Sequence, residues 1–233
     1  MLGSRRRYAS RQKAPRRRAA PFRCRLVVMA KVPVAGAVKT RLAREIGLAG
    51  AVRFARAAGA ALLARVGNDP RWQTTIAVAP DRGVASRAWP GRLKRMPQGG
   101  GDLGARMQRI LDRSPRGPVV IIGTDVPGIR PEHLAAAFRL LGNRDAVLGP
   151  AADGGYWLVG LKRRPRVLRP FGGVRWSGPH ALADTLANLA GWKVGCAATL
   201  GDVDDAAGLG ASADLLGRRV LPRSPATASA DAR

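Results

Sequence analysis

The sequence predicts an α/β fold: one domain with a mostly parallel sheet and helices on both of its faces. Short apolar runs of strand length alternate along the chain with segments whose apolar residues recur at helical spacing. The 233 residues, 46% of them hydrophobic, are enough for one large domain with its own core. We expect this domain to span residues 24–219, between a disordered basic arm (1–23) and a disordered tail (220–233).

The first half of the chain contains three expected strands and two helical segments. Residues 25–30 (RLVVMA) form a continuous apolar run, which is typical of a buried parallel strand. Residues 42–66 are rich in Ala and Leu at helical spacing, and Gly47 and Gly50 are expected to divide them into two helices. Further strands are expected at 73–80 and, more weakly, at 93–98, followed by an amphipathic helix that starts near Asp102.

The second half begins with the clearest strand of the sequence, the run PVVII at 118–122. A helix follows over 130–142, with Pro131 in its first turn and Gly142 past its end. The remaining expected elements are strands at 145–151, 154–161 and 192–200, and helices at 178–191 and 204–219.

Charged residues follow several of these strands. Lys31, Lys39 and Arg41 come after the first strand, Asp125 after the fourth, Asp153 between the fifth and sixth, and Asp202 and Asp204 after the last. In open α/β sheets, ligands bind at the carboxyl ends of the strands. Any one of these aspartates is explained well by capping a turn. Several of them opposite a cationic loop indicate instead a Mg²⁺ or Mn²⁺ ion that bridges the phosphates of a nucleotide.

The loop AKVPVAGAVKTRLA at 30–43 ends in Lys-Thr, like a Walker A loop. Val38 precedes Lys39 where that loop needs glycine, and Gly36 lies three residues before the lysine. The stretch is therefore not a Walker A loop, although its cations still require an explanation.

Two glycine-rich stretches have two readings each. Gly100 and Asp102 belong to a loop that opens a helix, and this loop either covers a base, sugar or phosphate of a ligand or is a flexible linker. Asp153, Gly154 and Gly155 either allow a ligand to approach the backbone closely or form a hairpin turn.

The net charge of +26 favours anionic partners, but it is spread along the chain. Residues 1–23 carry nine Arg or Lys and no acid, which leaves 32 cations against 15 acids in the remainder. A diffuse basic surface is the simpler reading, and the few aromatic residues offer no base-stacking platform, so nucleic-acid binding is not expected. We expect no membrane span and a cytoplasmic chain, with Cys24 and Cys196 as buried free thiols.

Six motifs, taken together and in this order, resemble one bacterial family. They are AKVPVAGAVKTRLA, QGGGDLGARM, GTDVPGI, GPAADGGYWLVGL, FGGVRWS and GDVDDAAGL. The family is that of GT-A-like glycosyltransferases of the radical-SAM/selenodomain-associated type, distantly related to molybdenum-cofactor nucleotidyltransferases and phospholactate guanylyltransferases. The chain departs from it at Gly178, where the family has Thr after Trp-Ser, and at Asp205, where it has Thr.

The resemblance implies a nucleotide-diphospho-sugar transferase fold and assigns roles to residues. Lys31, Gly36, Lys39 and Arg41 would face nucleotide phosphates. Asp125 would bind the metal, with Asp204 and Asp202 as further ligands. Asp153, Gly154, Gly155, Tyr156, Trp176 and Ser177 would lie on the acceptor side.

The expected function is a metal-dependent transferase with a nucleotide or nucleotide-sugar donor and a small-molecule acceptor, in which Asp125 and Lys39 are catalytic. Glycosyl transfer is the first reading, and nucleotidyl transfer to a small phosphorylated acceptor is the alternative. A non-catalytic protein that binds RNA or another polyanion on the same fold is the alternative of another class.

Overall fold

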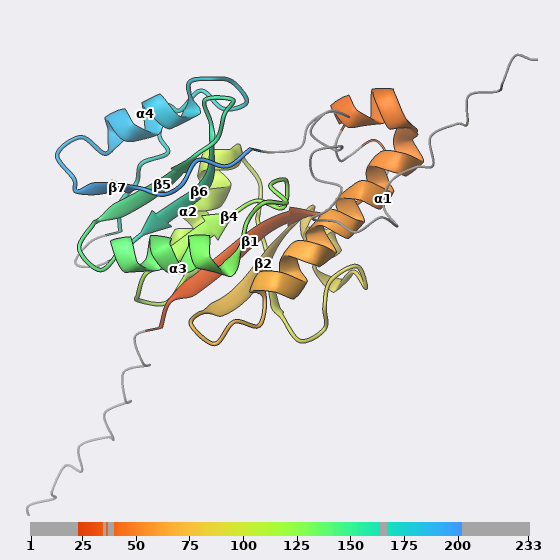
Figure 1. The fold of residues 1–233 in the computed structure, drawn as a ribbon, viewed down its shortest axis with the longest axis horizontal. Helices are drawn as coiled ribbons and strands as arrows, with labels where there is room; N and C mark the ends of the chain where they lie inside the picture. The colour runs from red at the N-terminus through yellow and green to blue at the C-terminus, as the bar shows by residue number, and fades with distance from the viewer. Residues whose placement is uncertain (1–22, 35, 37–39, 164–166, 202–233) are drawn as a thin grey trace, which may run out of the picture.

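A single seven-stranded sheet with helices on both faces forms the body of the protein in the computed structural model (Figure 1). The structure describes residues 23–34, 36, 40–163 and 167–201. The strands are β1 (Arg25–Lys31), β2 (Gln73–Ala79), β3 (Lys94–Pro97), β4 (Val119–Ile122), β5 (Ala146–Pro150), β6 (Tyr156–Leu161) and β7 (Val194–Cys196). The predicted fold class is therefore confirmed. Residues 202–219 of the expected domain, the tail and the arm before Arg23 lie outside the described residues.

The strand order is β3-β2-β1-β4-β6-β5-β7. β1 to β4 run parallel to one another, and β7 runs parallel to β5. β6 is antiparallel to both of its neighbours, β4 and β5. The reversal of β6 follows from the short turn that links it to β5, because a parallel connection needs a crossover of a dozen or more residues.

Alternate residues of β1 point into the two separate halves of the core. Leu26 and Val28 pack in a cluster with Leu62 of helix α1 (Thr40–Val66) and Leu134 of helix α3 (Pro131–Leu140). Val27 packs on the opposite face, with Ile110 of helix α2 (Leu103–Arg113) and Leu189, which follows helix α4 (Ala181–Asn188). α1 and α3 thus cover one face of the sheet, and α2 and α4 cover the other (Figure 1).

Helix α1 changes direction at Gly47, whose φ of 77° and ψ of 160° are not helical. The expected break is confirmed there but not at Gly50, which is buried within the continuing helix. Leu42–Val66 is, by length and composition only, long and apolar enough to cross a membrane, but one such helix is weak evidence because a helix of a protein core passes the same test. Its last turns pack Leu62, Leu63 and Val66 into the core, as a helix covering a sheet does.

The ends of the other helices follow the sequence signals. The Asp102 carboxylate caps α2 by accepting a hydrogen bond from Ala105 N at 2.7 Å. Pro131 is the first residue of α3, and Gly142 follows its C-cap. A short 3₁₀ helix, η1 (Asp81–Ala85), was not expected.

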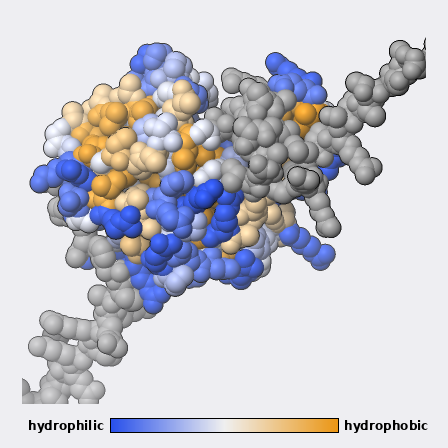
Figure 2. Space-filling model, viewed as in Figure 1, coloured by the Kyte–Doolittle hydropathy of each residue, from blue (hydrophilic) through white to orange (hydrophobic). Residues whose placement is uncertain are grey.

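Some apolar side chains are exposed on the side of the molecule where α4 and β7 lie (Figure 2). Leu186 of α4 and Trp192 just before β7 are both more than a third exposed. Both cysteines are free, as expected, but neither is fully buried: Cys24 is half-buried, and Cys196 is exposed because it ends the short strand at the edge of the sheet.

Candidate active site

A cleft of about 1170 Å³ opens at the carboxyl edge of the sheet. Lys31 reaches it from the end of β1, and Asp125 from the segment after β4. Asp102 enters from the start of α2, and Asp153 from the turn between β5 and β6. Cations and carboxylates from separate parts of the chain therefore share one cavity, at the edge where the sequence predicted it.

The register of the sheet explains why Lys31 and Asp125 reach the same cleft. β1 and β4 are adjacent and parallel, and Val28 is paired with Ile122. Lys31 and Asp125 each lie three residues further along, so both leave the sheet at the same level. Both residues are exposed, although Asp125 follows the fully buried strand VVII. The buried strand fixes the backbone, and the carboxylate is left accessible from the cleft.

The glycine-rich loop after β3 is held by two arginines of α2. Arg109 Nη1 donates hydrogen bonds to Gln98 O at 2.8 Å and to Gly100 O at 2.9 Å. Arg106 Nε donates to Gly101 O at 2.9 Å, and the Asp81 carboxylate accepts from Gly99 N at 2.9 Å. This loop is therefore ordered by side chains on both of its sides, unlike a flexible linker.

The backbone of the same loop has the shape of an anion-binding concavity. Gly99 and Gly101 have φ of 77° and 91°, whereas Gly100 between them does not have a positive φ. Alternation of this kind turns successive N–H groups toward one side. Within the described ranges, the N–H groups of Gly100 and Gly101 donate to no protein acceptor. They remain able to bind a ligand oxygen.

Gln98 is a site residue that we did not single out from the sequence. Its side chain is buried, and Nε2 donates to Ala30 O at 3.2 Å and to Ala77 O at 2.8 Å. It thereby ties together the carboxyl ends of β1 and β2, and Ala30 and Gln98 themselves line the cleft. A glutamine directly between a strand and a glycine run was the available signal.

The DGGYW stretch is a hairpin turn that also lines the cleft. The Asp153 carboxylate accepts a hydrogen bond from Gly155 N at 2.9 Å. Gly154, with φ of 82°, lies against the backbone of Pro179, where a Cβ atom would collide. The stretch therefore forms the hairpin turn that was one of our two readings. Asp153 and Gly155 also line the cleft, so the second reading, close approach of a ligand, stays a prediction.

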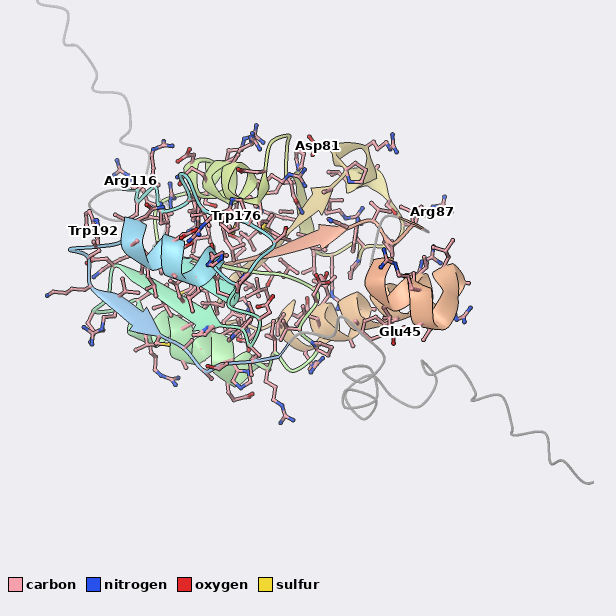
Figure 3. All side chains as sticks on the ribbon, turned by 90° about the horizontal axis from the view of Figure 1, so that it is seen from above. Glu45, Asp81, Arg87, Arg116, Trp176 and Trp192 are labelled. Carbon is pink, nitrogen blue, oxygen red and sulfur yellow. The ribbon has the colours of Figure 1, made fainter. Side chains whose placement is uncertain are left out.

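Aromatic side chains close one end of the cleft. The rings of Tyr156 and Trp176 meet edge to face with centroids 6.3 Å apart, and Trp176 lies beside α4 (Figure 3). Thr185 Oγ1 donates to the Tyr156 hydroxyl at 3.3 Å. Burial raises the pKa of Tyr156 above its ordinary value, so its phenol stays neutral at physiological pH. This end of the cleft can present ring surface and a neutral hydroxyl to a ligand.

Most of the described site residues that we expected line this one cleft. They are Lys31, Asp102, Asp125, Asp153, Gly155, Tyr156, Trp176 and Ser177. Gly36, Gly100 and Gly154 are described but are not part of its lining. Lys39, Asp202, Asp204 and the side chain of Arg41 lie outside the described residues. Three lining arginines, Arg56, Arg87 and Arg106, were not singled out, because a chain with this many arginines gives no local signal for them.

The described carboxylates suit a hard divalent cation. Among the residues placed by the structure, no three His, Cys, Asp or Glu side chains form a ready-made metal site. Mg²⁺ typically needs fewer, because it keeps several waters and binds one or two carboxylates together with substrate phosphates. Asp125 offers such a ligand in the cleft, and Asp153 Oδ2 has no recorded hydrogen bond within the described part of the chain. The donor set therefore fits Mg²⁺ or Mn²⁺.

Solved structures with the same fold include transferases. A candidate nucleotide-diphospho-sugar transferase from Desulfovibrio desulfuricans G20 has 25% identity and a TM-score of 0.72, over 85% of this chain and 98% of that one. A nucleotidyl transferase from Methanothermobacter has 15% identity and a TM-score of 0.57, over 84% and 99%. CMP:2-keto-3-deoxy-manno-octonic acid synthetase complexed with CTP has 14% identity and a TM-score of 0.51, over 84% and 99%.

The likenesses at 14% and 15% identity show a shared fold alone. The neighbour at 25% identity, which is covered over nearly its whole length, supports an enzyme of the transferase kind. Comparison with curated proteins found no match. A family model matches residues 62–178, from the end of α1 through the glycine-rich loop, Asp125 and the hairpin to Trp176. The chain therefore belongs to the family described as "Uncharacterized protein conserved in bacteria (DUF2064)".

Proposed function

We propose that the protein is a metal-dependent transferase that uses a nucleotide-activated donor, with a nucleotide sugar as the first choice. The observation that carries the proposal is that Lys31 and Asp125, from the carboxyl ends of the adjacent parallel strands β1 and β4, line one cleft together with an ordered glycine-rich loop. The candidate nucleotide-diphospho-sugar transferase at 25% identity supports the same class.

In this proposal, one end of the cleft binds the donor. Lys31 and the N–H groups of Gly100 and Gly101 bind phosphate oxygens, and the glycine-rich loop lies against the base or ribose. Gly36 and Lys39, between β1 and α1 in the sequence, and Arg41, the second residue of α1, are proposed to add contacts to the phosphates. Asp102 is proposed to stay at the rim of this region, where its carboxylate also caps α2.

Asp125 is proposed to hold Mg²⁺ or Mn²⁺ in this cleft, with Asp204 and Asp202 as further ligands. The ion would neutralise negative charge on the departing phosphate, as bound cations do in phosphoryl and glycosyl transfer. Lys31 and Lys39 would act on the same charge from the side of β1.

The acceptor is proposed to enter at the aromatic end. Tyr156 and Trp176 present ring surface that suits the apolar face of a sugar or another ring, while Asp153 and Ser177 can orient hydroxyl groups. This chemistry favours glycosyl transfer. Nucleotidyl transfer to a small phosphorylated acceptor uses the same donor half, and it is favoured instead if the donor proves to be a nucleoside triphosphate.

A thermal-shift screen of nucleotides and nucleotide sugars with Mg²⁺ or Mn²⁺ tests the proposal. A ligand at 100 times its Kd stabilises the protein by about 2.7 kcal/mol, which is readily detected. Asp125→Asn should fold normally and lose metal-dependent binding, because it keeps the size and hydrogen-bonding oxygen of the side chain but not its charge. Transfer activity should fall by several orders of magnitude.

The competing class is a protein that binds polyanions without catalysis. An Asp125→Asn variant that binds nucleotide and metal like the parent would favour that class and contradict the transferase mechanism. If Asp125→Asn unfolds, Asp125→Glu is the second variant, because it keeps the negative charge. A folded Asp125→Glu protein with a changed metal affinity would then support metal binding by Asp125.

A further inference from the structure

The cleft continues past the sheet edge into a recess between α1 and the loop at residues 86–89. The charged residues that line this recess are Arg56 of α1 and Arg87 of the loop. The carboxylates lining the described cleft come from other elements, after β4, in the β5–β6 turn and at the start of α2. Among the residues that the structure describes, the charged residues that line the α1 side of the cleft are therefore all cations, within an otherwise largely apolar lining.

The loop that carries Arg87 is fixed by its own hydrogen bonds. Arg95 of β3 donates to Val84 O at 3.0 Å, to Ser86 O at 3.1 Å and to Trp89 O at 3.1 Å. The Trp89 indole donates to Gly83 O at 3.1 Å. The backbone is thus held on both sides of Arg87, which lies beside α1 in Figure 3. An arginine on a rigid loop is already positioned to bind, so less entropy is lost when it does.

Arg56 and Arg87 have no acidic partner in the described part of the chain. Three other arginines do pair with aspartates there, namely Arg71 with Asp69, Arg169 with Asp112 and Arg175 with Asp184. The same side of the cleft is lined by Ala55, Gly59 and Ala88 together with the larger Phe54, Leu63 and Trp89. The small residues leave room for a ligand, and the two positive charges favour an anion.

We propose that Arg56 and Arg87 form a phosphate-binding subsite, separate from the residues at the sheet edge. A phosphate presents oxygens in several directions and can accept hydrogen bonds from guanidinium groups on two different elements, whereas a carboxylate best matches a single fork. The phosphate is either the outer group of the nucleotide donor or part of a phosphorylated acceptor. The subsite does not depend on the transfer chemistry proposed above.

Binding of inorganic pyrophosphate, measured by titration calorimetry at low ionic strength without divalent metal, tests the subsite. Arg56→Gln and Arg87→Gln should each weaken binding about tenfold, which corresponds to about 1.4 kcal/mol. Arg53→Gln and Arg82→Gln are matched controls, because they remove the same charge from α1 and η1 at exposed positions outside the cleft lining. These controls should bind like the parent.

A double Arg56→Gln/Arg87→Gln variant that binds pyrophosphate as the controls do overturns the subsite. If the double variant binds pyrophosphate more weakly than the controls, two series of titrations identify the source of the phosphate. One series uses the mono-, di- and triphosphate of one nucleoside, and the other uses sugar phosphates. A loss that grows with the number of phosphates assigns the subsite to the donor, and a loss confined to sugar phosphates assigns it to the acceptor. A loss for neither series overturns the proposal. Metal-dependent nucleotide binding that still requires Asp125 would leave the proposed function standing in every case.

Discussion

Arg109 organises the glycine-rich loop, and its replacement by Met tests whether loop order is needed for binding. Met keeps much of the aliphatic length of Arg109 but removes the guanidinium that holds Gln98 O and Gly100 O. Hydrogen bonds from a charged donor contribute about 1.5–3 kcal/mol each, and the lower value applies here because the Gly100 contact is exposed. The two lost hydrogen bonds would therefore remove about 3 kcal/mol of stabilisation from the observed loop conformation.

How this energy divides between stability and binding depends on whether the loop opens by itself. If it does, the free energy of unfolding changes little, and the nucleotide must order the loop when it binds. A loss of about 1.4–3 kcal/mol lowers the affinity by roughly ten- to a hundredfold. Titration calorimetry with the strongest nucleotide of the thermal-shift screen measures the affinity, and urea unfolding measures the stability.

Arg113→Met is the matched control, since Arg113 lies one turn further along α2 and is exposed without a recorded contact in the described structure. It should leave both quantities unchanged. Parental nucleotide affinity together with parental stability in Arg109→Met would refute the reasoning, because the lost hydrogen bonds would then show in neither quantity. Parental affinity with lowered stability would show that the loop does not open by itself and that the nucleotide does not have to order it.

Three further predictions concern the body of the protein. Gln98→Leu keeps the buried volume but loses two hydrogen bonds, so urea unfolding should show a loss of about 2–3 kcal/mol; a change below about 0.5 kcal/mol would contradict the role of Gln98 as a tie between strands. The Arg175 guanidinium holds the pKa of Asp184 well below its usual range. The pair therefore stabilises the fold fully when the pH is above the unfolded-state pKa of about 4, and this stabilisation is lost progressively as the pH falls below that value. Arg175→Gln should accordingly lower the Tm at pH 7 by more than at pH 3, and an equal difference at both pH values would argue against the charge interaction. Removal of residues 1–22 should leave the Tm unchanged, because the segment is outside the alternating pattern; a drop of many degrees would show that it packs on the body.

The sequence was most informative about features that follow from the spacing of apolar residues and from the direction in which the strands run. The apolar runs predicted every strand, and the rule for carboxyl ends of parallel strands predicted that Lys31, Asp125 and Asp153 would meet in one cavity. Glycine and proline signals located the bend at Gly47 and the start of α3. These features depend on local residue types, which a single sequence contains.

Other features depend on contacts between distant residues, which no local pattern records. Arg109 and Arg95 each hold a loop through backbone carbonyl groups, and carbonyl groups carry no sequence signature. The direction of β6 depends on the length of one turn, and its place between β4 and β5 depends on packing of the whole sheet. Arg56 and Arg87 were hidden by the general excess of arginine in this chain.

The reversed direction of β6 determines which part of the sequence supplies the residues at one end of the cleft. Because β6 runs against its neighbours, its first residue, Tyr156, lies at the edge where the other strands end. The residues that line the cleft consequently come from two separate stretches of the chain, 29–126 and 151–181. Because each stretch is contiguous in sequence, natural variation or a designed chimera can exchange the second for that of a relative while the first is kept. Under the proposed function, such an exchange would alter the choice of acceptor and preserve that of the donor.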